Sequence, residues 1–185
     1  MALAPSDPRD DLARLEPYLG EIAEACLLEG EDVALLCAIG LRETWFTWAP
    51  GYSPRGSILG RGDGGHGFGP YQIDNRGRYG HLPRECPEAT AFLQTRWVCQ
   101  VLRDARAELQ PYRDHPQFER AVCARYNASF ERVRIGLEAG DPDIGTTPSV
   151  RHGPGDYGKD VLRRRDWLRE NYPDRFPPAR RSAGT

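Results

Sequence analysis

The chain has 185 residues, with 25 Lys and Arg against 27 Asp and Glu, and 39% of its residues are apolar. At this length a single domain is expected, and about two thirds of the surface of the unfolded chain is buried on folding. The formal net charge of -2 argues against a protein that coats nucleic acid or an anionic membrane, because such proteins carry a strong basic excess. We therefore expect no nucleic-acid partner, and we look for a ligand in a local site.

Membrane, export and metal signals are all weak. No apolar run approaches the roughly 18 residues of a membrane helix, so we expect no membrane insertion. The first residues are acidic and contain prolines, whereas a signal peptide begins with a basic and then an apolar stretch. The five cysteines form no Cys-x-x-Cys pair and the four histidines no His-Glu-x-x-His motif, so neither a metal nor a cofactor is expected. We expect buried free cysteines, with one or two disulfides as the alternative.

Apolar residues at helical spacing predict two helices in the first part of the chain. The first has Pro17 in its first turn and ends at Gly30, and the second begins at Glu31 and runs to Phe46. Residues 49–80 combine many glycines with aromatic residues, which predicts a loop with short strands.

The second half of the chain has a simpler pattern. Further helices are predicted over residues 91–109, 118–126 and 157–172. After Pro173 the composition turns to Pro, Arg, Ser and Gly without a period. We therefore expect one domain over residues 1–173 and a disordered tail over residues 174–185.

Glu43 is the first candidate for chemistry, because it ends an apolar helix and precedes Trp45, Phe46 and Trp48. Aromatic surroundings disfavour the ionised carboxylate, and so does the negative end of the helix dipole. Both effects raise the pKa of the carboxyl group, as a general acid working near neutral pH requires. The alternative is an ordinary helix-end residue paired with Arg42 or another arginine.

A glycine-rich segment follows, with six glycines in residues 60–69. A flexible linker would explain the glycines, but Phe68 and Tyr71 are typical of a packed segment. Glycines beside aromatic residues also allow a ligand to approach the backbone closely. Phe68 and Tyr71 are therefore candidate ligand contacts, and His66 is a third, with an exposed loop histidine as its alternative.

Two aspartates, one within this segment and one shortly after it, are candidate partners for Glu43. They are Asp63 and Asp74. An acid that faces a second carboxylate across roughly 6.5–9.5 Å is the arrangement of an inverting glycosidase, because a water fits between the base and the sugar. A retaining enzyme would need a closer pair.

Five short segments stand in a particular order along the chain: Arg42-Glu43-Thr44, residues 62–74 (GDGGHGFGPYQID), Tyr126-Asn127-Ala128, residues 143–147 (DIGTT) and residues 156–161 (DYGKDV). Together they resemble the ordered motifs of goose-type lysozymes, over about residues 30–170. The resemblance implies a fold shared with soluble lytic transglycosylases. That fold is α+β and mostly α-helical, with a small β-hairpin beside a substrate cleft.

The resemblance also implies roles for individual residues. Glu43 would donate a proton to the glycosidic oxygen, while Asp63 and Asp74 would hold the attacking water. The cleft around the acid and the sugar would be lined by Gln72, Tyr126, Asn127 and Tyr157. The implied protein is a monomeric muramidase that cleaves β-1,4 links between N-acetylmuramic acid and N-acetylglucosamine in peptidoglycan, with inversion.

Three alternatives stay open. Lytic transglycosylases need no water-activating base, because the sugar's own 6-hydroxyl attacks and leaves an anhydro end; the presence of Asp63 and Asp74 favours hydrolysis. Chitin, a β-1,4 polymer of N-acetylglucosamine, is a second candidate substrate. A sugar-binding domain without turnover would follow if the departures from the family at Pro70-Tyr71 or Ser129 abolish catalysis.

The localisation stays open as well. The bacterial wall lies outside the cytoplasm, and the chain shows no signal peptide. Release through a membrane lesion, as for phage endolysins, delivery by a secretion machine, or earlier removal of a leader would each fit.

Overall fold

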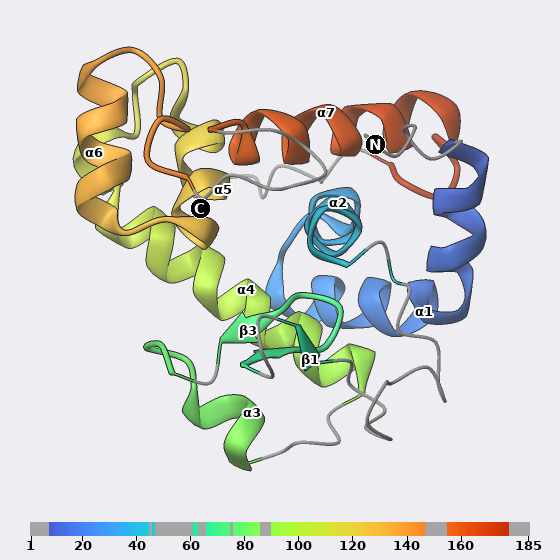
Figure 1. Cartoon of the computed structure of the whole chain (residues 1–185). Coiled ribbons are helices and arrows are strands. Elements are labelled where there is room, and N and C mark those ends of the chain that lie inside the picture. Colours follow the sequence, from blue (N-terminus) through green and yellow to red (C-terminus); the bar gives the residue numbers. More distant parts are fainter. Residues whose placement is uncertain are drawn as a thin grey trace, which may run out of the picture.

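The computed structural model describes residues 8–44, 46, 61–62, 66–74, 76–85, 90–146 and 155–177. This part of the chain forms seven α-helices and one small antiparallel sheet (Figure 1). The expected class, α+β and mostly α-helical, is confirmed. None of the helices in the described ranges has the length and apolar character needed to cross a bilayer.

Helix α2 (Val33–Glu43) is the centre of the molecule. Figure 1 shows it end-on, with α1 (Pro8–Glu29), α4 (Ala91–Glu108) and α7 (Tyr157–Asn171) around it. Every residue from Ala34 to Arg42 is buried, which is the pattern of a helix enclosed on all sides by others. The packing of the core around α2 therefore fixes the position of its last residue, Glu43.

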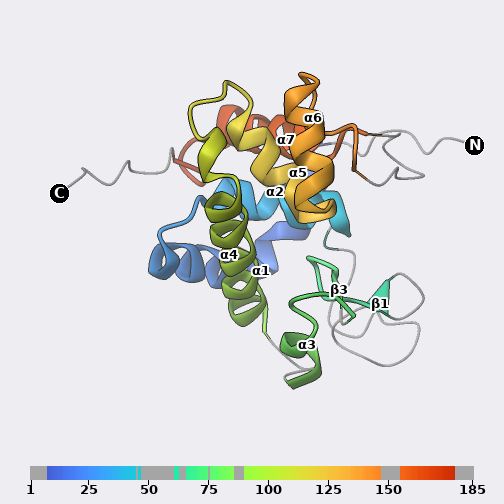
Figure 2. The ribbon, with the colours of Figure 1, turned by 90° about the vertical axis from the view of Figure 1, so that its left-hand side faces the viewer.

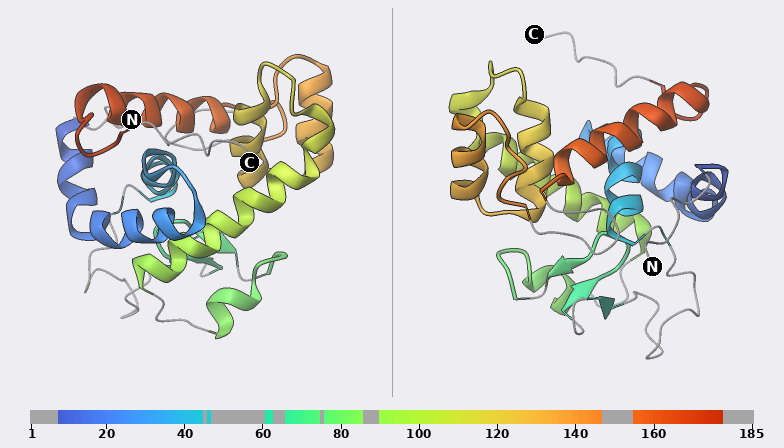
Figure 3. Two further views of the ribbon diagram at one scale, coloured as in Figure 1. Left: turned by 180° about the vertical axis from the view of Figure 1, so that it is seen from behind. Right: turned by 45° about the horizontal axis from the view of Figure 1, so that its top comes forward.

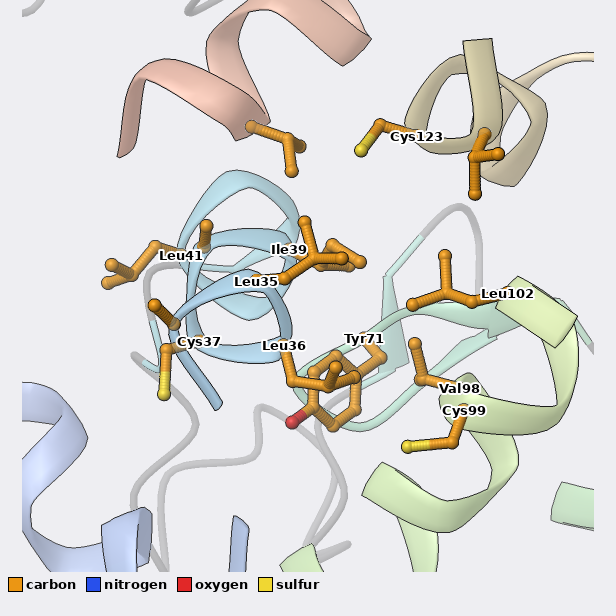
Figure 4. Close-up of a cluster of buried hydrophobic side chains, with 14 of the residues drawn as sticks. Leu35, Leu36, Cys37, Ile39, Leu41, Tyr71, Val98, Cys99, Leu102 and Cys123 are labelled. Atoms are coloured by element: carbon orange, nitrogen blue, oxygen red, sulfur yellow. The ribbon is translucent and has the colours of Figure 1, made fainter. Parts of the chain in front are cut away.

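The core is built around this helix. Figure 4 shows Leu36 and Ile39 of α2 in one cluster with Tyr71 and with Val98 and Leu102 of α4. Four cysteines are also completely buried in the structure: Cys26, Cys37, Cys99 and Cys123. All four are free thiols, as expected, and Cys86 lies outside the described residues.

Three residues at the predicted boundary determine the turn between α1 and α2. Gly30 has a φ of +70°, and the N–H of Glu31 donates to the carbonyl of Cys26 at 2.9 Å. This is the Schellman ending of a helix, which favours glycine. Asp32 then caps α2, because its carboxylate accepts from the N–H of Ala34 at 3.0 Å.

The predicted start of the first helix is wrong. Helix α1 begins at Pro8 rather than at Pro17, which lies inside it. An internal proline lacks the N–H for the i to i−4 bond and bends a helix, and Figures 1 and 3 show α1 as two straight segments that meet at a sharp bend. The apolar pattern that reaches back to Leu12 and Leu15 was the sign of the earlier start.

The remaining helices match the predicted ranges in part. The predicted helices over 91–109, 118–126 and 157–172 are confirmed to within two residues as α4, α5 (Phe118–Asn127) and α7. Two helices were not predicted, α3 (His81–Glu85) and α6 (Phe130–Glu138), and a 3-10 turn, Gln110–Tyr112, follows α4.

The sheet has three very short strands in the order β1-β2-β3, all antiparallel. They are β1 (Arg61–Gly62), β2 (Gly67–Phe68) and β3 (Ile73–Asp74). Gly67 pairs with Gly62 on one side and with Asp74 on the other. Figures 1 and 2 show the sheet and α3 on one side of the molecule, with α6 and α7 on the opposite side.

The C-terminal segment differs from the expected tail. Phe176 is completely buried and belongs to the core, and Arg175 forms an ion pair with Glu16 at 2.8 Å. Packing therefore continues past Pro173 as far as these residues, because Phe176 fills a place in the core. Residues 178–185 lie outside the described part of the chain.

Candidate active site

Glu43 is the last residue of α2, and the chain directly after it is tied to the sheet. The Thr44 hydroxyl donates to the carbonyl of Pro70 at 2.9 Å. Pro70 lies in the turn between β2 and β3, so the end of α2 and the tip of this hairpin are held together. Glu43 thus stands where the central helix meets the sheet.

Burial changes the acidity of Glu43. It raises the pKa of the Glu43 carboxyl from 4.5 to about 7, although the hydrogen bond from Tyr157 and the charge of Arg42 act in the opposite direction. A rise was predicted from the aromatic residues after the helix. Phe46 is indeed buried, while Trp45 and Trp48 lie outside the described residues.

Two tyrosines from different helices lie beside the acid. The Tyr157 hydroxyl donates to Oε1 of Glu43 at 2.5 Å, and the ring of Tyr157 stacks on that of Tyr126, with centroids 6.2 Å apart. Burial and the nearby Glu43 charge raise the pKa of both tyrosines well above 10. Both hydroxyls therefore keep their protons at neutral pH and remain donors.

Tyr126 provides a second link between the helices and the hairpin. Its hydroxyl donates to the carbonyl of Tyr71 at 2.6 Å. Tyr71 follows Pro70, which accepts the bond from Thr44. The hairpin turn is therefore held by α5 and by the end of α2 at two consecutive carbonyls.

Arg42 fastens α2 to α7 next to the acid. Its guanidinium donates to Asp156 at 2.9 Å and to Asp160 at 3.1 Å, and it lies over the ring of Tyr157, 5.3 Å from the centroid. The nitrogens that could have paired with Glu43 are thus bound to aspartates of the neighbouring segment. This arrangement disfavours the alternative in which Glu43 is a partner of Arg42.

Asp160 carries the charge that Arg42 neutralises. Burial alone would raise its pKa, but Arg164, Arg163 and Arg42 outweigh burial and lower the pKa to about 2. Asp160 is therefore ionised at neutral pH inside the protein. A buried ion pair of this kind is costly to break, because removing one partner leaves the other charge without compensation.

The turn between β2 and β3 depends on two residues with positive φ. Gly69 has a φ of +68° and Gln72 a φ of +49°. The Gln72 amide donates back to the carbonyl of Gly69 at 2.8 Å, which ties the turn together. Gln72 therefore lies in the hairpin tip, with its side-chain amide committed to the turn.

Asp74 ends β3 and is held by a neighbour. The Arg76 guanidinium donates to both carboxylate oxygens of Asp74, at distances down to 2.6 Å. These bonds lower the pKa of Asp74, with the charge of His66 as a smaller contribution. Asp74 is ionised at neutral pH and partly exposed. Asp63, the other proposed base, lies outside the described residues.

The structure brings three of the predicted residues together and buries two others. Glu43, Tyr126 and Tyr157 form one cluster. Phe68 and Tyr71 are buried, and the Tyr71 hydroxyl is bonded to Thr95 at 2.9 Å, which does not support their role as ligand contacts.

The two other predicted contacts lie near the cluster or the sheet. Asn127 is the last residue of α5 and half-buried, next to Tyr126. His66 directly precedes β2 and is also half-buried. Ser129 caps α6 by accepting from the N–H of Arg132 at 3.4 Å.

From the sequence, Thr44 and Asp143 had no role and Arg42 only that of a possible partner of Glu43, although all three stand within the quoted motifs. An arginine inside an apolar helix was the available signal for Arg42, because a buried arginine needs anionic partners. Within the described ranges, no three His, Cys, Asp or Glu side chains gather in a way that could hold a metal ion.

No protein-family model matches the chain, and no curated protein has a significantly similar sequence.

Proposed function

We propose that the protein is a glycoside hydrolase in which Glu43 is the general acid. One observation carries the proposal: burial at the end of α2 raises the pKa of Glu43 to about 7, while Tyr157 orients its carboxyl group. A carboxylic acid with a pKa near the working pH is still protonated in a large fraction of molecules, and its proton is easily given up. This is the property that the cleavage of a glycosidic bond requires of the acid.

The hydrogen bond from Tyr157 decides which oxygen carries the proton. Oε1 accepts the Tyr157 hydroxyl proton, so the acidic proton of Glu43 belongs on Oε2. In the proposed reaction that proton passes to the leaving oxygen as the bond to the sugar carbon breaks. The carboxylate that forms keeps its hydrogen bond from Tyr157, which stabilises the developing negative charge.

The resemblance supplies the proposed substrate, the β-1,4 link between N-acetylmuramic acid and N-acetylglucosamine in peptidoglycan. The resemblance to goose-type lysozymes also supports a lysozyme-like arrangement, with the hairpin of β2 and β3 beside the acid. Chitin, which lacks the lactyl ether, is the second candidate substrate. Binding of sugar without turnover is the outcome that would replace both.

The reaction also needs a nucleophile that attacks the sugar carbon, and there are two candidates. Water held by Asp63 or Asp74 would give hydrolysis with inversion. The sugar's own 6-hydroxyl would give the anhydro product of a lytic transglycosylase. The hydrogen bonds from Arg76 lower the pKa of Asp74. This favours the 6-hydroxyl as the nucleophile, because a carboxylate with a lowered pKa is a weaker base. Hydrolysis stays the main proposal, because Asp63 is a second candidate for the base that activates the water.

Clearing of purified cell walls tests the assignment of the acid. The wild-type protein should reduce the turbidity of a wall suspension, and Glu43→Gln should be slower by at least about a hundredfold. Glu24→Gln, the same chemical change at an exposed position on α1, is the matched control and should clear at the wild-type rate. Equal clearing by Glu43→Gln would remove Glu43 as the acid.

Mass spectrometry of the released fragments separates the reaction types. Reducing ends indicate a hydrolase, and anhydro ends indicate a transglycosylase. The same assay with chitin oligomers tests the second substrate. Binding to walls without any fragments would indicate a sugar-binding domain.

A further inference from the structure

Asp143 is a completely buried carboxylate that lies between α6 and α7. Its Oδ1 accepts from the N–H of Gly158 at 2.6 Å, and its Oδ2 accepts from the N–H of Lys159 at 3.0 Å. Arg120 of α5 donates to the same Oδ2 at 2.7 Å. The buried charge is therefore compensated by one arginine and two backbone donors.

The two backbone donors belong to the first turn of α7. Gly158 and Lys159 are its second and third residues, and their N–H groups are the ones that a cap residue normally binds. The residue in the cap position, Asp156, makes no such bond and gives its carboxylate to Arg42 instead. Asp143, which lies outside α7, therefore caps this helix in place of Asp156. The helix dipole also favours a negative charge at this end of α7.

The first turn of α7 has little room to move. A side-chain carbon at Gly158 would lie 2.4 Å from the carbonyl oxygen of Arg120 and 3.1 Å from Oδ1 of Asp143. Because both distances are shorter than normal contacts, only glycine lets the helix start this close to α5. The close approach at Gly158 and the hydrogen bonds to Asp143 therefore both restrict the first turn of α7.

Tyr157 is the first residue of α7 and precedes Gly158 directly. We propose that Asp143 is a positioning residue, which fixes the first turn of α7 so that the Tyr157 hydroxyl reaches Oε1 of Glu43. This inference rests on the proposed function where it concerns catalysis. The contact between Tyr157 and Glu43 that it explains does not depend on any substrate.

The test is a titration of Glu43 in Asp143→Asn. The asparagine amide can accept only through its oxygen, so either the bond from Gly158 or the bonds from Lys159 and Arg120 are lost. Tyr157 should then bind Glu43 less well, and the pKa of Glu43 should rise by roughly half a unit to one unit. The charged and titratable groups that face Glu43 in the described structure are Arg42, Tyr126 and Tyr157.

The readout is the chemical shift of the Glu43 carboxyl carbon in the 13C-labelled protein, assigned by its absence in Glu43→Gln. Thr90→Ala is the matched control, because it removes the cap of α4, far along the chain from Glu43. It should lower the melting temperature without moving the Glu43 titration. An equal shift in Thr90→Ala, or no shift in Asp143→Asn, would overturn the inference.

A double-mutant comparison shows whether Asp143 acts through Tyr157. In a Tyr157→Phe background, Asp143→Asn should add almost nothing to the shift of Glu43. Additive shifts would mean that Asp143 acts in another way and would also overturn the inference. If Asp143→Asn does not fold, Arg120→Gln loosens the same carboxylate from the other side and should give a smaller shift in the same direction.

Activity is measured separately, so that the two proposals can fail independently. With cell walls as substrate, Asp143→Asn should lower kcat by about fivefold to tenfold and leave KM unchanged. A wild-type protein that releases no fragments would contradict the proposed function but would leave the titration to decide the role of Asp143.

Discussion

The Tyr157 hydroxyl donates a hydrogen bond of 2.5 Å to Oε1 of Glu43, across 114 positions of sequence. One residue ends α2 and the other begins α7, so the bond exists only when these two helices are packed correctly. Arg42 strengthens the same junction through Asp156 and Asp160. The chemistry proposed for Glu43 is therefore coupled to the packing of two helix ends.

Tyr157→Phe should raise the pKa of Glu43 above about 7, because the hydrogen bond that it removes lowers that pKa. The pH above which kcat/KM declines should move upward. At pH 6 the rate should fall by about tenfold, since the carboxylate that forms loses its donor. Initial rates of wall clearing between pH 4 and 9 measure both effects.

Tyr126→Phe is the control for this profile. The Tyr126 hydroxyl donates to the carbonyl of Tyr71 and not to Glu43. The upper pH limit should therefore stay in place, whatever happens to the overall rate. A similar displacement in both variants would show that the hydroxyl of Tyr157 has no specific effect.

Glu43→Gln should stabilise the folded protein at alkaline pH. The pKa of Glu43 is raised in the folded state to about 7 from 4.5, so its contribution to stability is present below pH 4.5 and is lost as the pH rises through 7. At about 1.4 kcal/mol per pKa unit, the loss is at most roughly 3–4 kcal/mol.

Thermal unfolding measures this effect. The melting temperature of Glu43→Gln should exceed that of the wild type at pH 8, and the difference should shrink toward pH 4. A difference that does not depend on pH would contradict the raised pKa of Glu43. The melting temperature of Glu24→Gln should equal that of the wild type at both pH 8 and pH 4.

Arg42→Ala should destabilise the protein by roughly 3 kcal/mol, because it leaves the buried carboxylate of Asp160 with less compensation. Arg134→Ala is a matched control on the surface, since Arg134 also binds two carboxylates, Glu131 and Glu138. Exposed pairs of this kind contribute little to stability, because water and salt screen the charges. Urea unfolding of the two variants compares the losses, and equal losses would show that burial of the Arg42 ion pairs has no effect.

Gly69→Ala should cost more than Gly140→Ala. Both glycines have positive φ, +68° and +85°, so both substitutions bring backbone strain of about 1–2 kcal/mol. At Gly140 the new carbon meets nothing within 4 Å, whereas at Gly69 it would lie 1.6 Å from Oε1 of buried Gln94. The clash should add roughly 1–3 kcal/mol in urea unfolding, and similar losses would mean that Gln94 moves aside freely.

Arg76→Ala distinguishes the two proposed bases. The substitution removes the hydrogen bonds that lower the pKa of Asp74, so this pKa should rise toward 3.8. If Asp74 is the base, the acidic limit of kcat/KM should move to higher pH. An unchanged acidic limit, together with inactivity of Asp63→Asn, would assign the role to Asp63.

The sequence predicted elements where one physical signal dominates. The 3- and 4-residue spacing over 91–109 is long enough to identify α4, and Gly30 and Asp32 carry the chemistry of a helix end and a helix cap. The pKa of Glu43 was predicted to rise because both aromatic neighbours and the helix end act in the same direction. The start of α1 could not be predicted from Pro17, because proline is common in the first turn of a helix and so resembles a helix start.

Other features could not be read from the sequence because they depend on distant partners. Helix α6 has only a few apolar positions and is held by Ser129 and by surface ion pairs of Arg134. Tyr71 resembles a ligand contact in the sequence, yet its ring fills the core beside Thr95. The bond from Asp143 to the start of α7 joins a loop to a helix, and no local pattern indicates such a contact.

The four buried thiols provide a probe of the core that needs no engineering. Cys26, Cys37, Cys99 and Cys123 are completely shielded from solvent in the native state, and burial raises the pKa of the Cys123 thiol to about 12. A thiol reagent can therefore reach them only in molecules whose helices have separated. Because they come from α1, α2, α4 and α5, mass spectrometry of the labelled peptides would report the order in which the helices around α2 come apart.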